Sequence, residues 1–299
     1  MRHSMNSEKR FRLMCAVIMS IFAALCIAPF ILMISASITD EAALINDGYR
    51  FIPSKVSLAA YQYLWAKRET IGRAYLISII VTAVGTVANV LITTMFAYPL
   101  SRKDFKARNV LAFFIFFTML FNGGMTASYI IWTQTFHIKN TIWALLLPNY
   151  LMSGMNVLLV RNYYVGSIPN EILEAARIDG ASELKIYSQI MLPLAKPVII
   201  TIALFAGMAY WNDWSNAMYY ISNQKLYSIN AYLNNLQNNI KLLSMQSSLT
   251  EGLNLTGLQL PTIGARMAIA MIAVLPVMVI FPFIQSQLIK GVVIGGVKG

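Results

Sequence analysis

Six long apolar stretches divide the chain, and shorter segments between them hold most of the charged residues. The stretches cover residues 13–37, 74–100, 110–132, 141–160, 198–221 and 263–288. Their apolar residues are continuous, and at about 1.5 Å of helical rise per residue each is long enough to cross a hydrocarbon core of roughly 30 Å. Because backbone polar groups in lipid must be satisfied within the segment, the pattern predicts an all-α membrane protein with six transmembrane helices.

The composition agrees with this pattern. Hydrophobic residues make up 58% of the chain and charged residues 12%, and the mean hydropathy is +0.61. A soluble globule of 299 residues needs more polar surface than this composition provides. The net charge of +11 does not indicate nucleic-acid binding, because the basic residues are spread over the boundaries of the apolar stretches.

The distribution of Lys and Arg predicts the orientation. If the N-terminus is cytoplasmic and the chain alternates sides, fourteen of the 23 Lys and Arg residues fall inside and eight fall in the outer loops. This bias follows the positive-inside rule, so both termini are expected in the cytoplasm. The first apolar stretch, at 25 residues, exceeds the roughly 7–15 residues of a signal-peptide core, so an uncleaved first helix is expected.

Three parts follow from this topology. Residues 1–73 are expected to hold the N-terminal tail, the first transmembrane helix and an outer loop. Residues 74–288 are expected to form a core with five transmembrane helices, and residues 289–299 a cytoplasmic tail that is flexible because of its glycines. That tail would either enter a groove on a partner or form a frayed end.

The chain offers no residue set for covalent chemistry. His3 falls in the basic N-terminal tail and His137 in a short predicted outer loop. Cys15 and Cys26 lie about three helical turns apart, too far for a disulfide or a shared metal. The phosphate-binding pattern G-x-x-x-x-G-K-[ST] does not occur. We therefore expect no catalytic residue, no metal and no cofactor, so energised transport would need a partner ATPase or an ion gradient.

The predicted cytoplasmic loop over 162–196 is amphipathic and longer than a turn requires. Pro169 suits the first turn of a helix, and Gly180 is placed to end it. Ser182 is placed to cap a second helix that ends before Pro193. The pattern predicts a cytoplasmic helix-turn-helix between transmembrane helices four and five.

A spaced motif lies within this loop. Glu174-Ala-Ala is followed after three residues by Gly180 and after nine more by Ile190-Met-Leu-Pro. The pattern resembles the EAA loop of binding-protein-dependent ABC importer permeases. The resemblance implies a loop that docks onto a separate ATPase and couples it to transport, through Glu174, Ala175, Ala176, Gly180, Ile190, Leu192 and Pro193. The residues alone leave an alternative, in which Glu174 only pairs with Arg177 on a solvated helix.

Four further stretches resemble the carbohydrate branch of these permeases, particularly those for oligosaccharides and polysaccharide fragments. They are Ala97-Tyr-Pro-Leu-Ser-Arg-Lys-Asp, Phe121-Asn-Gly-Gly, Trp211-Asn-Asp-Trp and the C-terminal Ile289-Lys-Gly-Val-Val-Ile-Gly-Gly-Val-Lys-Gly. The resemblance implies half of a translocation pathway for carbohydrate in the bacterial cytoplasmic (inner) membrane.

The implied partners are a second homologous permease, an ATP-binding cassette ATPase dimer, an extracellular or periplasmic solute-binding protein, the carbohydrate and membrane lipid. The chain itself is not expected to be an enzyme, because the partner hydrolyses ATP. The rival hypothesis is a secondary transporter, or half of one, driven by an ion gradient.

Two charged residues lie inside the apolar stretches. Asp213 is in the fifth and Arg266 is in the sixth, and the predicted topology places both near the outer leaflet. Each side chain could reach the outer headgroups by itself, or the two could form an ion pair that closes the outer end of a pathway. The sequence leaves both interpretations open.

The residues Trp211, Asn212, Asp213 and Trp214 form a candidate substrate path. Trp211 and Trp214 are three positions apart and are predicted to share a helix face. Their rings would stack on the apolar face of a pyranose, and the amide of Asn212 would bond its hydroxyl groups. The alternative is that both tryptophans anchor the outer aromatic belt.

The long outer segment over 222–262 is rich in polar and aromatic residues. It would either contact the delivering protein or cap the chain's own helices. The residues in question are Tyr219, Tyr220, Tyr227 and Tyr232, with the Asn-rich stretch 234–239.

Overall fold

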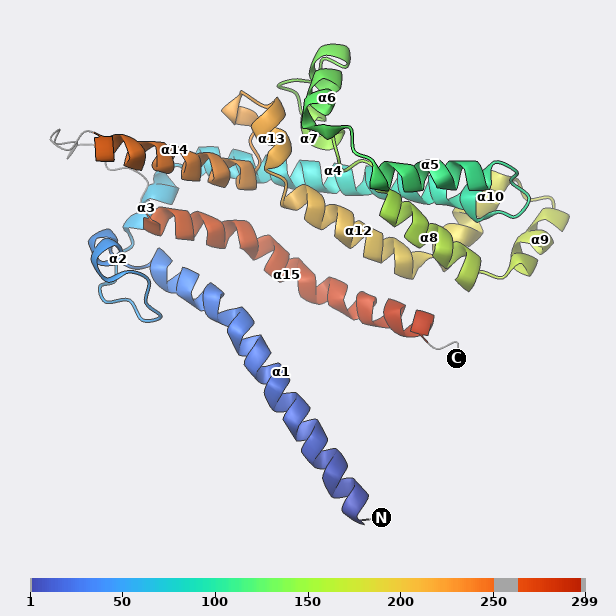
Figure 1. Ribbon diagram of the computed structural model, residues 1–299, viewed down its shortest axis with the longest axis horizontal. Helices are drawn as coiled ribbons and strands as arrows, with labels where there is room; N and C mark the ends of the chain where they lie inside the picture. Colours follow the sequence, from blue (N-terminus) through green and yellow to red (C-terminus); the bar gives the residue numbers. More distant parts are fainter. Residues whose placement is uncertain (1, 250–262, 297–299) are drawn as a thin grey trace. The chain divides into compact units, whose positions relative to one another are not determined.

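The computed structural model describes residues 2–249 and 263–296 (Figure 1). These residues are mostly helical, and in this part of the chain the only β structure is an isolated bridge between Thr39 and Val56. The predicted all-α class is therefore confirmed. The chain divides into two compact units, one made of Met1–Arg68 with Asn235–Leu275 and the other of Glu69–Asn234 with Pro276–Gly299.

The smaller unit begins with α1 (Arg2–Ser37), whose apolar side chains are exposed along most of its length. It continues with α2 (Glu41–Asp47) and α3 (Ala59–Ala66), and includes parts of α14 (Ile229–Leu249) and α15 (Ile263–Gly296). The carboxylate of Glu41 accepts hydrogen bonds from the backbone N–H groups of Ile263 at 2.9 Å and Gly264 at 3.3 Å. A carboxylate in this place satisfies unpaired donors at the start of α15 and complements the helix dipole.

The larger unit contains most of the remaining helices. In chain order they are α4 (Arg68–Ser101), α5 (Arg108–Leu120), α6 (Gly124–Ile130), the π-helical turn η1 (Ile131–Thr135), α7 (Trp143–Leu146), α8 (Gly154–Ser167), α9 (Asn170–Ile178), α10 (Glu183–Ile186), the π-helical turn η2 (Tyr187–Met191), α11 (Leu192–Leu194), α12 (Lys196–Trp211), α13 (Ser215–Tyr220) and the short 3₁₀ turn η3 (Gln224–Leu226).

Three helices are long and apolar enough to cross a membrane, namely Glu8–Ser37, Arg68–Ser101 and Ile263–Ile280. Two bent pairs raise the number to five if each is one span: Arg108–Leu120 with Gly124–Thr135, bent by 113°, and Glu183–Leu194 with Lys196–Trp211, bent by 82°. These numbers refer to residues 2–249 and 263–296 alone. Six spans, cytoplasmic termini and the division at residues 73 and 288 stay predictions.

Breaks interrupt three of the stretches that the sequence predicted as single helices. The stretch 110–132 breaks between α5 and α6, where Gly124 has φ 80°. The stretch 141–160 is divided into α7 and α8, with Asn149 at φ 69° between them. The stretch 198–221 is divided into α12 and α13. At the first two breaks a residue in the left-handed region interrupts the right-handed helix, which hydropathy alone does not detect.

The C-terminal end also differs from its prediction. The tail over 289–299 was expected to be flexible, but α15 continues to Gly296, and 297–299 lie outside the described residues. A glycine costs a helix only about 1 kcal/mol relative to alanine, so a few glycines do not by themselves end one.

Two groups of buried apolar side chains hold the larger unit together. The loop-side cluster joins the C-terminal end of α4 to α8, α9, α10 and α12, and includes Val160, Leu173 and Ile186. The break-side cluster joins the N-terminal half of α4 to the region around α7, α12 and α13, and includes Tyr210 and Tyr220. Helix α4 therefore contributes to both clusters.

Candidate functional site

The loop between α8 and α12 forms the predicted helix-turn-helix. Helix α9 ends at Ile178, two residues before Gly180, which has φ 77°. The N–H of Gly180 donates to the carbonyl of Arg177 at 3.0 Å, and the N–H of Ala181 donates to that of Ala176 at 2.9 Å. This pair of bonds is a Schellman motif, which needs a residue that tolerates the left-handed conformation. The predicted end of the first helix at Gly180 is confirmed.

The second helix begins as predicted and ends later. The Ser182 hydroxyl accepts a long 3.4 Å hydrogen bond from the N–H of Lys185. The sequence predicted an end before Pro193, but the helical path continues through η2 and α11 to Leu194. Proline lacks an N–H and clashes with the carbonyl four residues earlier. The wider π turn at 187–191 precedes Pro193 and relieves the clash with that carbonyl, so the helix continues past Pro193.

The helix-turn-helix has a buried face and an exposed face. Leu173 and Ile186 are buried in the loop-side cluster. On the other face Ile178 is 87% exposed and Leu184 is 70% exposed. A Cβ added at Gly180 would meet no atom within 4 Å. Apolar side chains exposed beside a bare glycine suit a partner surface that approaches the backbone closely.

The residues that the resemblance assigned to coupling fall on both faces. Glu174, Ala175 and Gly180 are exposed together with Pro193. Ala176, Ile190 and Leu192 are half-buried and pack against the loop-side cluster. The motif therefore contains an outward set that a partner can reach and an inward set that holds the two helices in place.

Ion pairs fasten the loop to the end of α4. The Arg177 guanidinium donates to Asp104 at 2.8 Å, and its Nε donates to Glu183, also at 2.8 Å. The hydroxyl of Tyr98, on α4, donates to the other oxygen of Glu183. The hydrogen bond from Arg177 lowers the pKa of Asp104 below its ordinary value. Arg177 is therefore engaged by these two acids and not by Glu174, the pairing that the sequence left open.

A second polar network surrounds the helix breaks, and Asp213 lies at its centre. One oxygen of the buried Asp213 accepts hydrogen bonds from the Ser215 N–H at 3.0 Å, the Ser215 hydroxyl at 2.9 Å and the Asn216 N–H at 3.1 Å. It therefore satisfies the backbone N–H groups of the first two residues of α13. Arg266 belongs to the other compact unit, so the ion pair between Asp213 and Arg266 stays a prediction.

Asn216 extends this network to the break between α7 and α8. Its amide donates to the carbonyl of Pro148 at 3.1 Å and accepts from the amide of Asn149 at 3.0 Å. The amide of Asn89 donates to the carbonyl of Tyr150 at 2.7 Å. Non-helical backbone at membrane depth is tolerated where protein groups satisfy it, and these amides do so. Sequence reasoning missed them, because asparagines in apolar stretches carry no local signal of their partners.

The two tryptophans of the predicted path do not share a continuous helix face. Helix α12 ends at Trp211, and Trp214 lies in the break before α13, where it is 45% exposed. The prediction that Trp211 and Trp214 share a helix face was therefore wrong, because the helix does not continue through 212–214. The substrate path and the aromatic belt both stay predictions.

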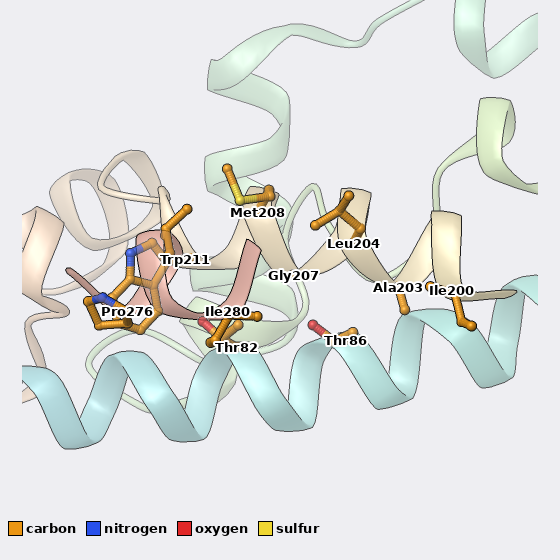
Figure 2. Close-up of a pocket in the computed structure, with 11 residues that line it drawn as sticks. Thr82, Thr86, Ile200, Ala203, Leu204, Gly207, Met208, Trp211, Pro276 and Ile280 are labelled. Atoms are coloured by element: carbon orange, nitrogen blue, oxygen red, sulfur yellow. The ribbon is translucent and has the colours of Figure 1, made fainter. Parts of the chain in front are cut away.

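Trp211 lines an apolar pocket of about 340 Å³ between α4, α12 and the part of α15 that belongs to the larger unit (Figure 2). Nearly all of its lining is apolar. The lining residues are Thr82, Thr86, Ile200, Ala203, Leu204, Gly207, Met208, Trp211, Pro276, Val277 and Ile280.

Apolar spans, broken helices and a helix-turn-helix with an exposed face define a membrane transport subunit that works with a partner. Comparison with known proteins specifies the class. The family model described as binding-protein-dependent transport system inner membrane component matches residues 89–294. The chain belongs to this family, which confirms the predicted family and the predicted membrane location.

Two relatives from Bacillus subtilis (strain 168) are each 34% identical to the chain. The polygalacturonan/rhamnogalacturonan transport system permease protein YtcP matches 93% of this chain and 94% of its own, and protein LplC matches 99% of each. The crystal structure of a bacterial ABC transporter involved in the import of the acidic polysaccharide alginate includes a chain with a TM-score of 0.77 and 27% identity, covering 94% of this chain and 97% of that one. The alternative of an ion-gradient-driven transporter finds no support here.

Proposed function

We propose that this chain is the permease subunit of an ATP-binding cassette importer for an oligosaccharide or polysaccharide fragment. It forms half of the translocation pathway, and the helix-turn-helix couples that pathway to a separate ATPase dimer. The named relatives support a carbohydrate substrate, since one is called a polygalacturonan/rhamnogalacturonan permease and the solved neighbour imports alginate. The remaining partners are a second homologous permease and an external solute-binding protein.

One observation carries the coupling proposal, namely that the two faces of the helix-turn-helix have opposite characters. The exposed face presents Glu174, Gly180 and Ile178 without covering atoms at the glycine. The other face is fixed by Arg177 to Asp104, just beyond the end of α4, and to α4 itself by the buried hydrogen bond between the hydroxyls of Tyr187 and Thr94 at 2.9 Å. A force applied to the exposed face is therefore transmitted to α4, which packs against both buried clusters.

At the outer segment, two neighbouring tyrosines differ in exposure. Tyr220 is fully buried and stacks on Tyr129 with ring centroids 5.9 Å apart, which supports the interpretation of a cap on the chain's own helices. Tyr219 is 40% exposed and remains accessible to a delivering protein. Residues 250–262, part of the same predicted segment, lie outside the described residues.

The coupling proposal is tested by two substitutions at Gly180 in the complete transporter. Gly180→Asn keeps a residue that tolerates the left-handed conformation, so the Schellman motif survives, but it adds a side chain to the open side of the turn. Gly180→Trp adds more bulk there. We expect sugar uptake and transport-coupled ATPase activity to fall several-fold in Gly180→Asn and to be nearly lost in Gly180→Trp, with normal membrane abundance.

Gly72 supplies the matched control, because a Cβ at this position also meets no atom within 4 Å and the residue lies on α4, outside the loop. Gly72→Trp is expected to leave coupling unchanged. Normal coupled ATPase activity in an abundant Gly180→Trp complex would contradict docking at this face.

A second experiment tests the energy source of the wild-type transporter. Sugar uptake that survives an ionophore and stops when ATP is withdrawn supports the ABC class, whereas the opposite result would overturn it.

A further inference from the structure

The end of α4 is followed by an arginine that is buried but makes no hydrogen bond through its side chain. Arg102 is 9% exposed and lines a second pocket, of about 370 Å³, between the end of α4 and the helix-turn-helix. Its Nε is buried and lies 3.4 Å from a carboxylate oxygen of Asp104, without hydrogen-bond geometry. The two terminal nitrogens also make no hydrogen bond within the described residues, but unlike Nε they keep accessible surface. The pocket therefore contains charged donors that a ligand can reach.

An aromatic ring lies against this guanidinium. The central carbon of the Arg102 guanidinium lies 5.9 Å from the centroid of the Tyr98 ring, a cation–π contact that leaves the N–H donors free. A guanidinium donates to two oxygens of a phosphate or carboxylate in a forked contact. Because a buried charged donor without a partner is costly, the arrangement indicates an anion as the occupant.

The two acids in the pocket do not provide a cation site. One oxygen of Glu183 accepts a hydrogen bond from Arg177 and the other accepts one from Tyr98. One oxygen of Asp104 accepts from Arg177, and the other is the one beside Arg102. All four carboxylate oxygens are therefore engaged, and the two arginines balance the two negative charges. Three further basic residues adjoin the pocket in sequence, namely Lys103, Lys106 and Arg108. The surroundings favour an anion over a cation.

The position of Arg102 indicates which anion is available. The span Arg68–Ser101 ends one residue before it, so this side chain lies at the depth of the lipid headgroups. Phe105, which is partly exposed, also lines the pocket. The first turns of α5 then present large apolar side chains that are each more than half exposed, namely Val110, Phe113 and Phe114. Phospholipids supply phosphate groups at this depth, and the apolar side chains beside the pocket suit their acyl chains.

We propose that this pocket binds the phosphate group of an anionic phospholipid, with Arg102 as the anchor. The terminal N–H groups of Arg102 donate to two phosphate oxygens, and the acyl chains lie along the exposed face of α5. A zwitterionic lipid is less suitable, because its own cation would lie among the basic residues 103–108. Since Arg177 and Glu183 line the same pocket, the bound headgroup lies beside the ion pairs that fasten the helix-turn-helix. The inference depends on the membrane location alone and not on the proposed substrate or ATPase.

The test counts the lipid that the complete transporter retains. Wild-type, Arg102→Gln and Lys103→Gln complexes are placed in nanodiscs of phosphatidylcholine with increasing fractions of phosphatidylglycerol, and native mass spectrometry counts the phosphatidylglycerol bound to each. The two variants each remove one positive charge, one from a buried and one from an exposed side chain. We expect Arg102→Gln to weaken phosphatidylglycerol binding about tenfold, which corresponds to roughly 1.4 kcal/mol. Lys103→Gln should weaken it only about twofold, because salt screens an exposed charge.

Arg102→Lys separates charge from geometry. It keeps the charge but cannot make the forked contact, so its phosphatidylglycerol binding should lie between wild type and Arg102→Gln. Equal losses in Arg102→Gln and Lys103→Gln would overturn the site, because diffuse surface charge would then explain the binding.

Three further results would contradict the proposal. A wild-type complex that retains phosphatidylcholine and phosphatidylglycerol equally would overturn it, and this measurement requires no variant to fold. If added inorganic phosphate removes the bound phosphatidylglycerol, the ligand is a free phosphate ion and not a lipid. If Arg102→Gln releases the ATPase but keeps its phosphatidylglycerol, the arginine binds a partner carboxylate instead. Each of these outcomes is independent of sugar uptake by the wild type.

Discussion

The two polar networks of the larger unit differ in chemistry and in exposure. At the loop side, Arg177 joins Asp104 and Glu183 through charges, and all three side chains are at least one-third exposed. At the helix breaks, Asn216 and Asn149 join carbonyls and amides through neutral groups, with Asp213 as the single charge. Asn216 is fully buried and Asp213 is 6% exposed.

The two networks therefore differ in how much stability is lost when one of their contacts breaks. Exposed ion pairs contribute little to stability, typically about 0–1 kcal/mol, so they can break and form again while a loop is pulled by its partner. Buried amides that satisfy broken helices leave unpaired groups when they are lost, which is more costly. On the proposed function, the break-side network fixes the shape of the subunit, whereas the loop-side network links that shape to the docking loop.

The largest effect on stability is expected at the contact between α4 and α12. In Gly85→Ala the new Cβ would lie 2.5 Å from the ring of Tyr210, whose hydroxyl is held by the carbonyl of Leu146 at 2.8 Å. The ring cannot move without losing that bond, so we expect a loss near the upper end of about 1–3 kcal/mol. Thermal unfolding of the solubilised complex measures it.

Gly72→Ala on the same helix is the matched control. No atom lies within 4 Å of its added Cβ, so it should be neutral or stabilise by roughly 0.5–1 kcal/mol. Equal melting temperatures for Gly85→Ala and Gly72→Ala would show that the close contact of α4 with Tyr210 does not hold the break-side region together.

Asn216→Leu should have the next largest effect. It leaves the buried carbonyl of Pro148 without its partner, which is expected to cost about 2 kcal/mol, whereas the amide of the exposed Asn149 can turn outward. We expect lower abundance and a lower melting temperature, with uptake per folded complex also reduced. Asn239→Leu at an exposed position should stay within about 0.5 kcal/mol of wild type. If both variants behave alike, the amide network is not a structural element.

Arg177→Ala is expected to reduce transport much more than it reduces stability. Its stability cost should remain below about 1 kcal/mol because the ion pairs are exposed. Uptake per ATP hydrolysed should fall several-fold, since α9 is no longer fixed to Asp104. Arg177→Lys should recover only part of the loss, because an ammonium cannot reproduce the forked contact with two acids. A variant that loses stability but keeps its coupling ratio would assign Arg177 a purely structural role.

The smallest effect concerns the pH dependence of the same ion pairs. Arg177 lowers the pKa of Asp104, so the carboxylate stabilises the folded state above its unfolded pKa of about 3.9. This contribution is lost as the pH falls through the lower pKa of the folded state. The difference in melting temperature between wild type and Asp104→Asn should therefore be constant above about pH 5 and shrink toward pH 3. A difference that grows toward low pH would contradict the pairing.

The sequence alone predicted the helical membrane class and the turn at Gly180. Both depend on local information. Insertion into lipid follows from the composition of one continuous segment, and a glycine at the end of an amphipathic helix marks its end whatever lies around it. The EAA spacing indicated the family, and the matched family model confirms that family.

Only the tertiary structure decided where the apolar stretches break and what stabilises the breaks. Asn216 reaches Pro148 across 68 positions of sequence, and Arg177 reaches Asp104 across 73. Hydropathy treats Thr82 and Thr86 as tolerable residues in a span. Only the structure shows that their buried hydroxyl groups have no hydrogen-bond partner within the described residues. The physical reason is that a polar group in an apolar segment is satisfied by whatever the fold brings to it, and that neighbour is not encoded in the residues beside it.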